Sequence, residues 1–264
     1  MTRDIRRSDK KRSLLVLSLV LAALAAGIGC TPARPSQSLS VAAAADLQFA
    51  LEEGSRAFRS SHPAVTLRIA YGSSGNFFAQ LRNQAPFDIF LSADAEFPQQ
   101  LLRQGVGVPD SLFVYAIGGI AVWVPKASPL DPANAFQSAQ IRHFAIANPQ
   151  HAPYGRAAEA ALRTLGAYDL LKDKLVFGEN VAQTLEFVQS GAADAGIIAL
   201  SLALAPAVRD QGRYWVVPAD KYPKLEQAGV IVKDSPAARE FRDWLLSPAG
   251  AGILQSYGFS APAK

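Results

Sequence analysis

The sequence predicts an α/β protein of two lobes, each with a mainly parallel sheet flanked by helices. A short apolar run without polar alternation, at 39–44, is typical of a strand buried on both faces, and 65–71 is expected to form a second strand. Segments with apolar residues at helical spacing follow these runs, so strands and helices alternate along the chain. About 225 residues follow residue 38, enough for one large domain or two lobes of roughly 100 residues each.

The first part of this region predicts three strand–helix pairs. Strands are expected at 39–44, 65–71 and 87–93, and helices between Leu47 and His62, around 77–81 and at 97–103. The helix after the first strand has a single apolar stripe and ends at His62-Pro63, because proline cannot continue a helix. Gly72-Ser73-Ser74-Gly75 is expected to form the turn after the second strand.

The longest β-like run, 113–124, contains Gly118 and Gly119 at its middle. A strand that bends at such a pair is suited to cross from one lobe to the other. Beyond it, strands are expected at 143–147, 176–177, 195–200, 214–217 and 229–232, and helices at 156–165, 181–189 and 237–246. Lobe one would then comprise 39–117 plus about 229–264, and lobe two about 118–228.

Residues 1–29 have the layout of an export signal, with basic residues up to Arg12 and an apolar run at 14–29. Sixteen residues at about 1.5 Å each fall short of the roughly 30 Å hydrocarbon core. Cys30, the single cysteine, follows Gly27-Ile28-Gly29 in a pattern that resembles a bacterial lipobox, and 30–38 would be a tether. The expected location is the periplasm or cell envelope, with a lipid on Cys30 as the only membrane contact. The alternative is an uncleaved anchor with an incidental cysteine.

Charge and composition exclude several classes of function. The formal net charge of +4 equals the excess of six basic over two acidic residues within 1–29, so a broad basic face for nucleic acid is not expected. One cysteine and three scattered histidines predict no zinc or iron–sulfur site and no cofactor. Ser73 and Ser74 lack the spacing of a nucleophile elbow, and the chain is not expected to be an enzyme.

Four predicted strand-to-helix junctions share one form, in which an apolar strand ends in small or polar residues before a helix. They lie at 44–46, 72–75, 153–155 and 179–181. Ligands of parallel α/β sheets collect beyond the carboxyl ends of the strands, where helix N-termini present unpaired N–H groups and partial positive charge. No Lys or Arg occupies these junctions. Each one alone reads as an ordinary helix start, but the four together predict a cage of neutral donors for a small oxyanion.

Several short motifs, in order along the chain, carry a resemblance to a known family. They are VAAAADL at 41–47, GSSG at 72–75, FDIFLSAD at 87–94, VPKAS at 124–128, ANPQHAPYG at 147–155 and YGF at 257–259. From Leu39 to about Phe259 the chain resembles the molybdate-binding proteins of ABC importers. The resemblance implies the two-lobed periplasmic-binding-protein fold, type II-like, with crossover strands. It also implies a monomer that captures molybdate or tungstate between its lobes and delivers it to a membrane ABC permease.

The resemblance also implies which residues bind the oxyanion, through hydroxyl and backbone N–H groups rather than through the metal. The first ligand serine of the family falls on Asp46, the second on Ser74, and the N–H donors of lobe two fall on Tyr154 and Val181. A tyrosine of many members falls on Ala199, and the Tyr154 side chain is a candidate to supply the missing hydroxyl.

Asp46 is the more serious departure, because a carboxylate beside a dianion is repulsive. One unit-charge pair at about 5 Å costs roughly 3 kcal/mol at an effective dielectric of 20. In one interpretation, which we prefer, Asp46 caps its own helix and contributes only its N–H. In the other, Asp46 accepts a proton-bearing oxygen, as in hydrogen phosphate or a phosphonate, and the receptor binds that ligand instead.

Overall fold

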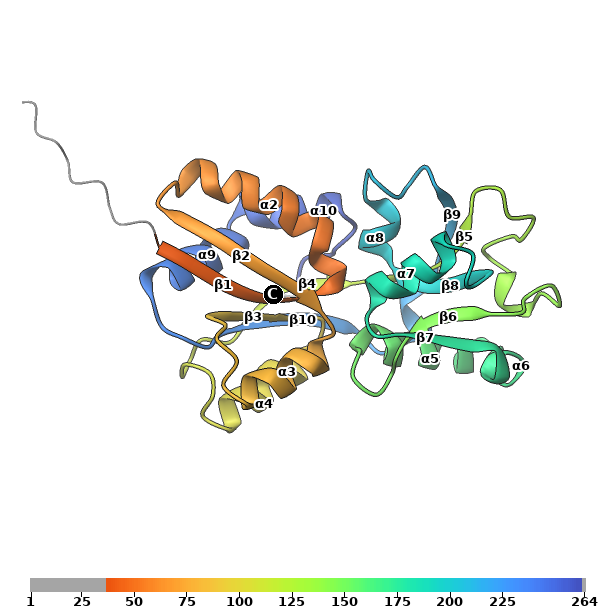
Figure 1. Cartoon of the computed structure of the whole chain (residues 1–264), viewed down its shortest axis with the longest axis horizontal. Coiled ribbons are helices and arrows are strands. Elements are labelled where there is room, and N and C mark those ends of the chain that lie inside the picture. Colours follow the sequence, from red (N-terminus) through yellow and green to blue (C-terminus); the bar gives the residue numbers. More distant parts are fainter. Residues whose placement is uncertain (1–36, 263–264) are drawn as a thin grey trace, which may run out of the picture. The chain divides into compact units, whose positions relative to one another are not determined.

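The computed structural model describes residues 37–262, so the expected export signal, Cys30 and most of the tether lie outside the described residues. Strands and helices alternate along the described chain and form two sheets of five strands each (Figure 1). We call each sheet with its helices a lobe. No helix within 37–262 is both long enough and apolar enough to cross a membrane.

Lobe one has the strand order β2-β1-β3-β10-β4. Its strands are β1 (Gln37–Ala44), β2 (Val65–Gly72), β3 (Ile89–Ser92), β4 (Phe113–Gly118) and β10 (Leu225–Ile231). Its helices are η1 (Ala45–Leu47), α2 (Gln48–Ser61), α3 (Ser74–Arg82), α4 (Glu96–Arg103), α9 (Pro236–Leu246) and α10 (Pro248–Ser256).

Lobe two has the strand order β7-β6-β8-β5-β9. Its strands are β5 (Ile120–Pro125), β6 (Phe144–Ala147), β7 (Leu175–Gly178), β8 (Ala195–Ala199) and β9 (Gly212–Val216). Its helices are η2 (Ala135–Gln137), α5 (Pro153–Thr164), α6 (Tyr168–Leu171), η3 (Lys172–Lys174), α7 (Val181–Gln189), α8 (Leu200–Leu204) and η4 (Ala219–Lys221).

One strand in each sheet runs against the other four. In lobe one β10 is antiparallel to both its neighbours, and in lobe two β5 is antiparallel to both of its own. β5 and β10 are the strands that the chain enters on crossing from the other lobe. Each crossing enters the new sheet at the carboxyl ends of its parallel strands. The new strand therefore runs antiparallel to them. The predicted α/β fold with mainly parallel sheets is thus confirmed, and the carboxyl ends of both sheets face the junction between the lobes.

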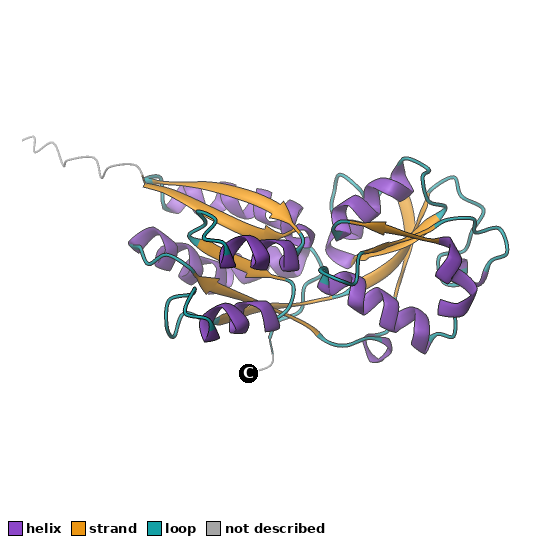
Figure 2. Ribbon diagram, turned by 60° about the horizontal axis from the view of Figure 1, so that its bottom comes forward, coloured by secondary structure: helices purple, strands orange, loops and turns teal. Residues whose placement is uncertain are grey.

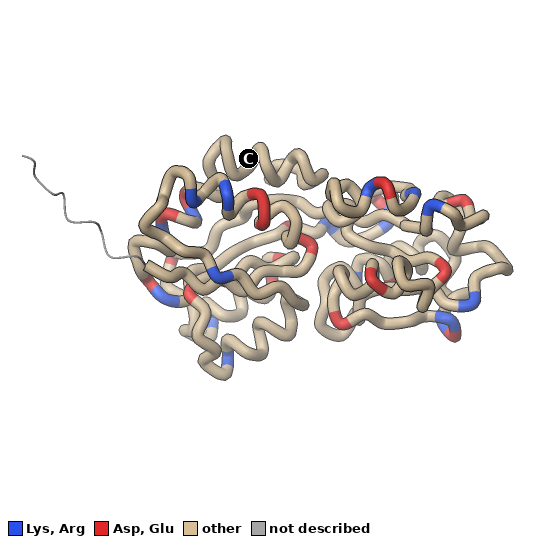
Figure 3. The backbone as a smooth tube through the Cα atoms, turned by 45° about the horizontal axis from the view of Figure 1, so that its top comes forward, with Lys and Arg blue, Asp and Glu red and all other residues tan. Residues whose placement is uncertain are grey.

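Helices cover both faces of each sheet (Figure 2), which explains why every residue of the strands β3, β6 and β8 is buried. In β1, Val41 and Ala43 belong to the core cluster shared with α2 and α9, whereas Ala42 packs in the cluster of Phe77 and Leu101 from α3 and α4. In lobe two, α7 and α5 lie on opposite faces of the sheet (Figure 1). Basic and acidic residues are interspersed along the backbone of both lobes (Figure 3).

Several predicted boundaries differ from the structure. The run 113–124 forms two strands in different sheets, with the break at Gly119, where the predicted bend lies. The turn at 72–75 is shorter than expected, because α3 already begins at Ser74. Helix α10 was not predicted. Strand β10 begins at Leu225, so the expected lobe boundary near 229 falls inside this strand.

Candidate functional site

A small cavity lies where the carboxyl ends of the two sheets meet. Residues from all four predicted junctions line it. Its lining comprises Ala44, Ala45, Asp46, Gly72, Ser73, Ser74, Ala93, Ala152, Pro153, Tyr154, Asn180 and Val181. The four residues expected to bind an oxyanion, Asp46, Ser74, Tyr154 and Val181, are therefore brought together, two from each lobe.

Backbone N–H groups without acceptors come from both lobes. Ser74 and Val181 are the first residues of α3 and α7, and Tyr154 is the second residue of α5 after Pro153, so none of them has an acceptor within its own helix. Among the hydrogen bonds of residues 37–262, none uses the N–H of these three residues. Each N–H is therefore available to a guest in the cavity that its residue lines.

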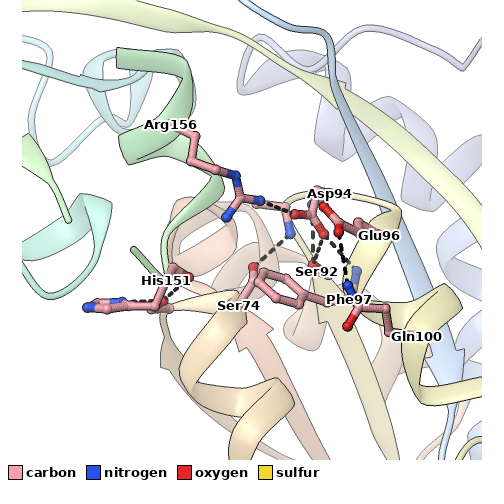
Figure 4. A network of polar contacts seen from close by, with 10 residues as sticks. Ser74, Ser92, Asp94, Glu96, Phe97, Gln100, His151 and Arg156 are labelled. Carbon is pink, nitrogen blue, oxygen red and sulfur yellow. Dashed lines mark hydrogen bonds and ion pairs between the residues drawn. The ribbon is translucent and has the colours of Figure 1, made fainter. Parts of the chain in front are cut away.

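The hydrogen bonding of the Ser74 hydroxyl fixes its donor and acceptor roles. Its oxygen accepts the N–H of Ala93 at 3.0 Å, the only hydrogen bond of this side chain within the described chain (Figure 4). Ser74 is 1% exposed, so water does not compete for its hydroxyl hydrogen. The hydroxyl hydrogen has no acceptor within the described chain, so it is left to donate, as an anion requires.

Neither Lys nor Arg is among the residues that line the cavity. The nearest cation along the chain, Arg156, follows Tyr154 by two positions but binds the Asp94 carboxylate at 2.5 Å (Figure 4). Within 37–262, no cluster of three or more His, Cys, Asp or Glu residues is placed to hold a metal ion. The cavity offers neutral, directed donors, which select a small oxyanion by size and geometry.

Asp46 does not cap its helix, so the preferred interpretation of this residue was wrong. Asp46 lies inside the 3₁₀ turn η1, and Leu47 takes the N-cap position of α2 without a side-chain cap. Asp46 Oδ2 instead accepts one hydrogen bond from each lobe, from the Tyr154 hydroxyl of lobe two at 3.0 Å and from the Gln227 amide Nε2–H of lobe one at 2.5 Å. The short 3₁₀ turn removes the geometry that an N-cap needs.

Asp46 is also the most perturbed acid of the site. It is 1% exposed, and burial raises its pKa to about 6, although the hydrogen bonds from Gln227 and Tyr154 act in the opposite direction. Its second oxygen, Oδ1, is buried without any hydrogen-bond partner in the described structure.

The hydroxyl of Tyr154 is engaged with protein groups rather than free for a ligand. It donates to Asp46 and receives the Gln227 amide at 3.1 Å. It therefore does not replace the hydroxyl lost at Ala199, which ends β8 as a buried residue.

Gln227, Tyr115 and Ser201 belong to the site but were not predicted. Gln227 is fully buried in β10, and the register of β10 against β4 shifts between Gln227 and Ala228, which redirects side chains locally. Tyr115 hydrogen-bonds Gln227 at 3.0 Å, and Ser201 donates to the Asp46 carbonyl at 2.7 Å. A glutamine inside an otherwise apolar strand is the signal that could have identified the first of these.

Direct contacts hold the two lobes together around the cavity. The carbonyl of His151 in lobe two accepts the Ser73 hydroxyl at 2.6 Å and the Gly75 N–H at 2.8 Å. Arg156 bridges to Asp94 in lobe one, whose other carboxylate oxygen accepts the Phe97 N–H (Figure 4). The structure is thus a closed arrangement of the two lobes.

Arg156→Ala is expected to weaken ligand capture by roughly threefold to tenfold. Asp94 is largely buried, and without Arg156 its carboxylate would remain unpaired in the closed arrangement but could hydrate when the lobes open. Calorimetric titration with molybdate measures the change. Arg163→Ala is the matched control, because Arg163 pairs with Glu159 on the same helix and spans no lobe boundary. Equal affinities for the two variants would contradict a role of Arg156 in closure.

Comparison with known proteins identifies the family to which this fold and site belong. The chain belongs to the bacterial extracellular solute-binding protein family, whose model matches residues 39–260. It is accordingly a binding protein of the cell exterior or periplasm and not an enzyme.

Within this class, the similar proteins include molybdate binders. The chain is 35% identical to the molybdate-binding protein ModA of Azotobacter vinelandii over 249 residues, 92% of this chain and 97% of the relative. It is 30% identical to the putative ABC transporter substrate-binding lipoprotein YvgL of Bacillus subtilis over 264 residues, 96% of this chain and 99% of the relative. The solved periplasmic molybdate-binding protein of Azotobacter vinelandii aligns with a TM-score of 0.80 at 33% identity, covering 85% of this chain and all of that one.

Proposed function

We propose that this protein is the receptor of an ABC importer that captures molybdate or tungstate between its lobes and delivers it to a membrane permease. The observation that carries the proposal is the cavity itself. Unpaired N–H groups of Ser74, Tyr154 and Val181 and the Ser74 hydroxyl meet there from both lobes, without a cation. The molybdate-binding relatives support the choice of anion.

Capture and delivery follow from the division of donors between the lobes. An anion contacts all of them only when the lobes are closed, so it stabilises the closed form by its differential affinity. The closed form carries a surface composed of both lobes, which the permease would recognise. No covalent chemistry is needed.

Molybdate and tungstate are expected to raise the melting temperature of the purified protein by about 8–16 °C at a thousand times the dissociation constant. Ligand at that level adds roughly 4 kcal/mol of apparent stability, and 1 kcal/mol corresponds to about 2–4 °C in a chain of this size. A thermal-shift panel that includes sulfate and phosphate measures the selectivity, and sulfate should give a much smaller shift. The absence of a shift with both metal oxyanions would reject the assignment.

A second candidate is a receptor for an oxyanion that brings its own proton, such as hydrogen phosphate or a phosphonate. The unpartnered, buried Oδ1 of Asp46 favours it, because a ligand O–H could donate to this oxygen. A larger thermal shift with phosphate than with molybdate in the same panel would select this candidate.

We further propose that the protein is exported by residues 1–29, lipidated at Cys30 and tethered by 30–38. The basic and apolar segments of the sequence and the similarity to the lipoprotein YvgL support this assignment. We propose that the functional unit is a monomer. Lobe one comprises 39–117 plus the C-terminal segment that begins with β10, and lobe two comprises the residues between these two parts.

A further inference from the structure

The two carboxylate oxygens of Asp46 have different environments. Oδ2 receives two hydrogen bonds, from Tyr154 and from Gln227. Oδ1 receives none, although Asp46 lines the cavity and is 1% exposed. A buried carboxylate oxygen without a donor is costly, and because Asp46 lines the cavity we infer that a guest in the cavity is the group that Oδ1 contacts.

The guest of the proposed function is molybdate or tungstate, an anion that carries no proton near neutral pH and therefore cannot donate a hydrogen bond to an ionised carboxylate. If Asp46 is ionised, its Oδ1 and an oxyanion oxygen repel each other at a position buried from solvent. If Asp46 is protonated, the same contact becomes an O–H···O⁻ hydrogen bond, which is among the strong ones.

The hydrogen bonds also decide which oxygen carries the proton. Tyr154 O–H and Gln227 N–H both point at Oδ2, so a proton on that oxygen would compete with two donors. Oδ1 meets no donor from the described protein and is the oxygen on which a proton can reside.

We propose that Asp46 binds the oxyanion as a neutral carboxylic acid that donates its Oδ1–H, so that each molybdate captured takes up one proton. This inference rests on the proposed function. The proton comes from the solvent: the carboxylate of the unliganded protein, one proton and the dianion combine into a complex in which the proton stays on Asp46. Asp46 then performs the donor role that a serine hydroxyl would otherwise perform.

The surroundings of Asp46 favour the neutral acid. The groups that face it are Tyr154 of α5, Tyr115 of β4 and the neutral amide of Gln227, and the pKa values of both tyrosines are raised well above their ordinary range by burial. Four other elements pack against η1. Helix α8 carries no titratable residue, and the titratable residues of α2, β2 and α7 form no hydrogen bond with Asp46. These residues are Glu52, Glu53, Arg56, Arg59, Arg68, Tyr71 and Glu186.

The sign of the pH dependence follows from proton linkage. At pH 7 an acid with a pKa of about 6 is roughly 90% ionised, and opening the lobes hydrates Asp46 and increases that fraction. The complex contains the protonated form, so binding must take up nearly one proton. Affinity should fall about tenfold per unit as pH rises above 7, and level off only below the pKa of Asp46 in the open, unliganded form, which hydration holds below the value of about 6 in the closed arrangement.

Isothermal titration of the purified protein with sodium molybdate, in buffers of different ionisation enthalpy at pH 7 and 8, measures this uptake directly. We expect about 0.9 to 1 proton per molybdate, and an affinity at pH 8 about tenfold below that at pH 7. Tungstate should give the same proton number.

Two substitutions separate the roles of the side chain. Asp46→Asn keeps the shape, can receive Tyr154 and Gln227 on its oxygen and presents an N–H in place of Oδ1–H, so it should bind within a few-fold of the protein at pH 7 without proton uptake or pH dependence. Asp46→Ala removes the donor and should bind at least tenfold more weakly than Asp46→Asn. Asp131→Asn, at an exposed loop carboxylate, is the control and should keep the uptake of one proton.

Molybdate binding without proton uptake, or equal pH profiles for the protein and Asp46→Asn, would overturn the inference and leave the proposed function intact. Failure of both metal oxyanions to bind at any pH from 6 to 8 would instead refute the proposed function, and the inference with it. Melting curves of each variant identify any change that comes from misfolding.

Discussion

Gly75→Ala is expected to weaken molybdate binding more than a hundredfold while leaving the stability of the unliganded protein nearly unchanged. A Cβ at Gly75 would lie 2.5 Å from the carbonyl oxygen of His151 and 2.9 Å from its Cα, both backbone atoms of the opposite lobe. The methyl group therefore obstructs closure without disturbing lobe one itself. Overpacking against backbone costs about 3 kcal/mol, which is more than two orders of magnitude in affinity.

Calorimetry gives the affinity of this variant, and melting curves with and without molybdate show where the cost falls. Gly252→Ala is the matched control, because a Cβ at this position in α10 meets nothing within 4 Å. The control should bind as the unchanged protein does. If Gly75→Ala bound molybdate with unaltered affinity, the close contact between Gly75 and His151 would not belong to the state that holds the anion.

Local signals explain how much of the fold could be predicted. The helix at 181–189 has the predicted bounds, because Asn180 caps it through Ala182 and Gln183 and the apolar residues after it keep helical spacing. The β10 strand was predicted too short, since Glu226 and Gln227 interrupt the apolar pattern on which strand prediction depends. Helix α10 was missed although Ser247 caps it and Pro248 starts it, because its five central residues contain two glycines and show a weak apolar stripe.

The candidate site also contains residues that could be predicted from the sequence and residues that could not. Ser74, Tyr154 and Val181 could be placed from sequence because each follows the end of a parallel strand, and topology alone brings those ends together. The environment of Asp46 could not, since its partners Tyr154 and Gln227 are 108 and 181 residues away along the chain. The contact with Tyr154 depends on how the two lobes close and the contact with Gln227 on how β10 joins the lobe-one sheet, and no local pattern encodes either.

Gly155→Ala is the second substitution with a large expected effect. It should lower the stability of the fold rather than obstruct closure of the lobes. A Cβ at Gly155 would come within 2.8 Å of the backbone carbon of Asn148 and closer still to Ala147, at the point where α5 passes over the end of β6. Both elements belong to lobe two, so the clash persists whether the lobes are open or closed. We expect a loss of about 3 kcal/mol and a melting temperature lower by about 6–12 °C without ligand.

The two glycine substitutions therefore separate two effects on binding. Gly155→Ala places a clash within lobe two, and Gly75→Ala places a clash between the lobes. Gly155→Ala should lower the unliganded melting temperature and also weaken binding, because α5 carries the Tyr154 N–H and cannot shift without moving it. Gly75→Ala should weaken binding alone. Melting curves of both variants beside Gly252→Ala make the comparison. If Gly155→Ala melted like the unchanged protein, the close approach of α5 to β6 would not be what fixes the lobe-two half of the anion cage.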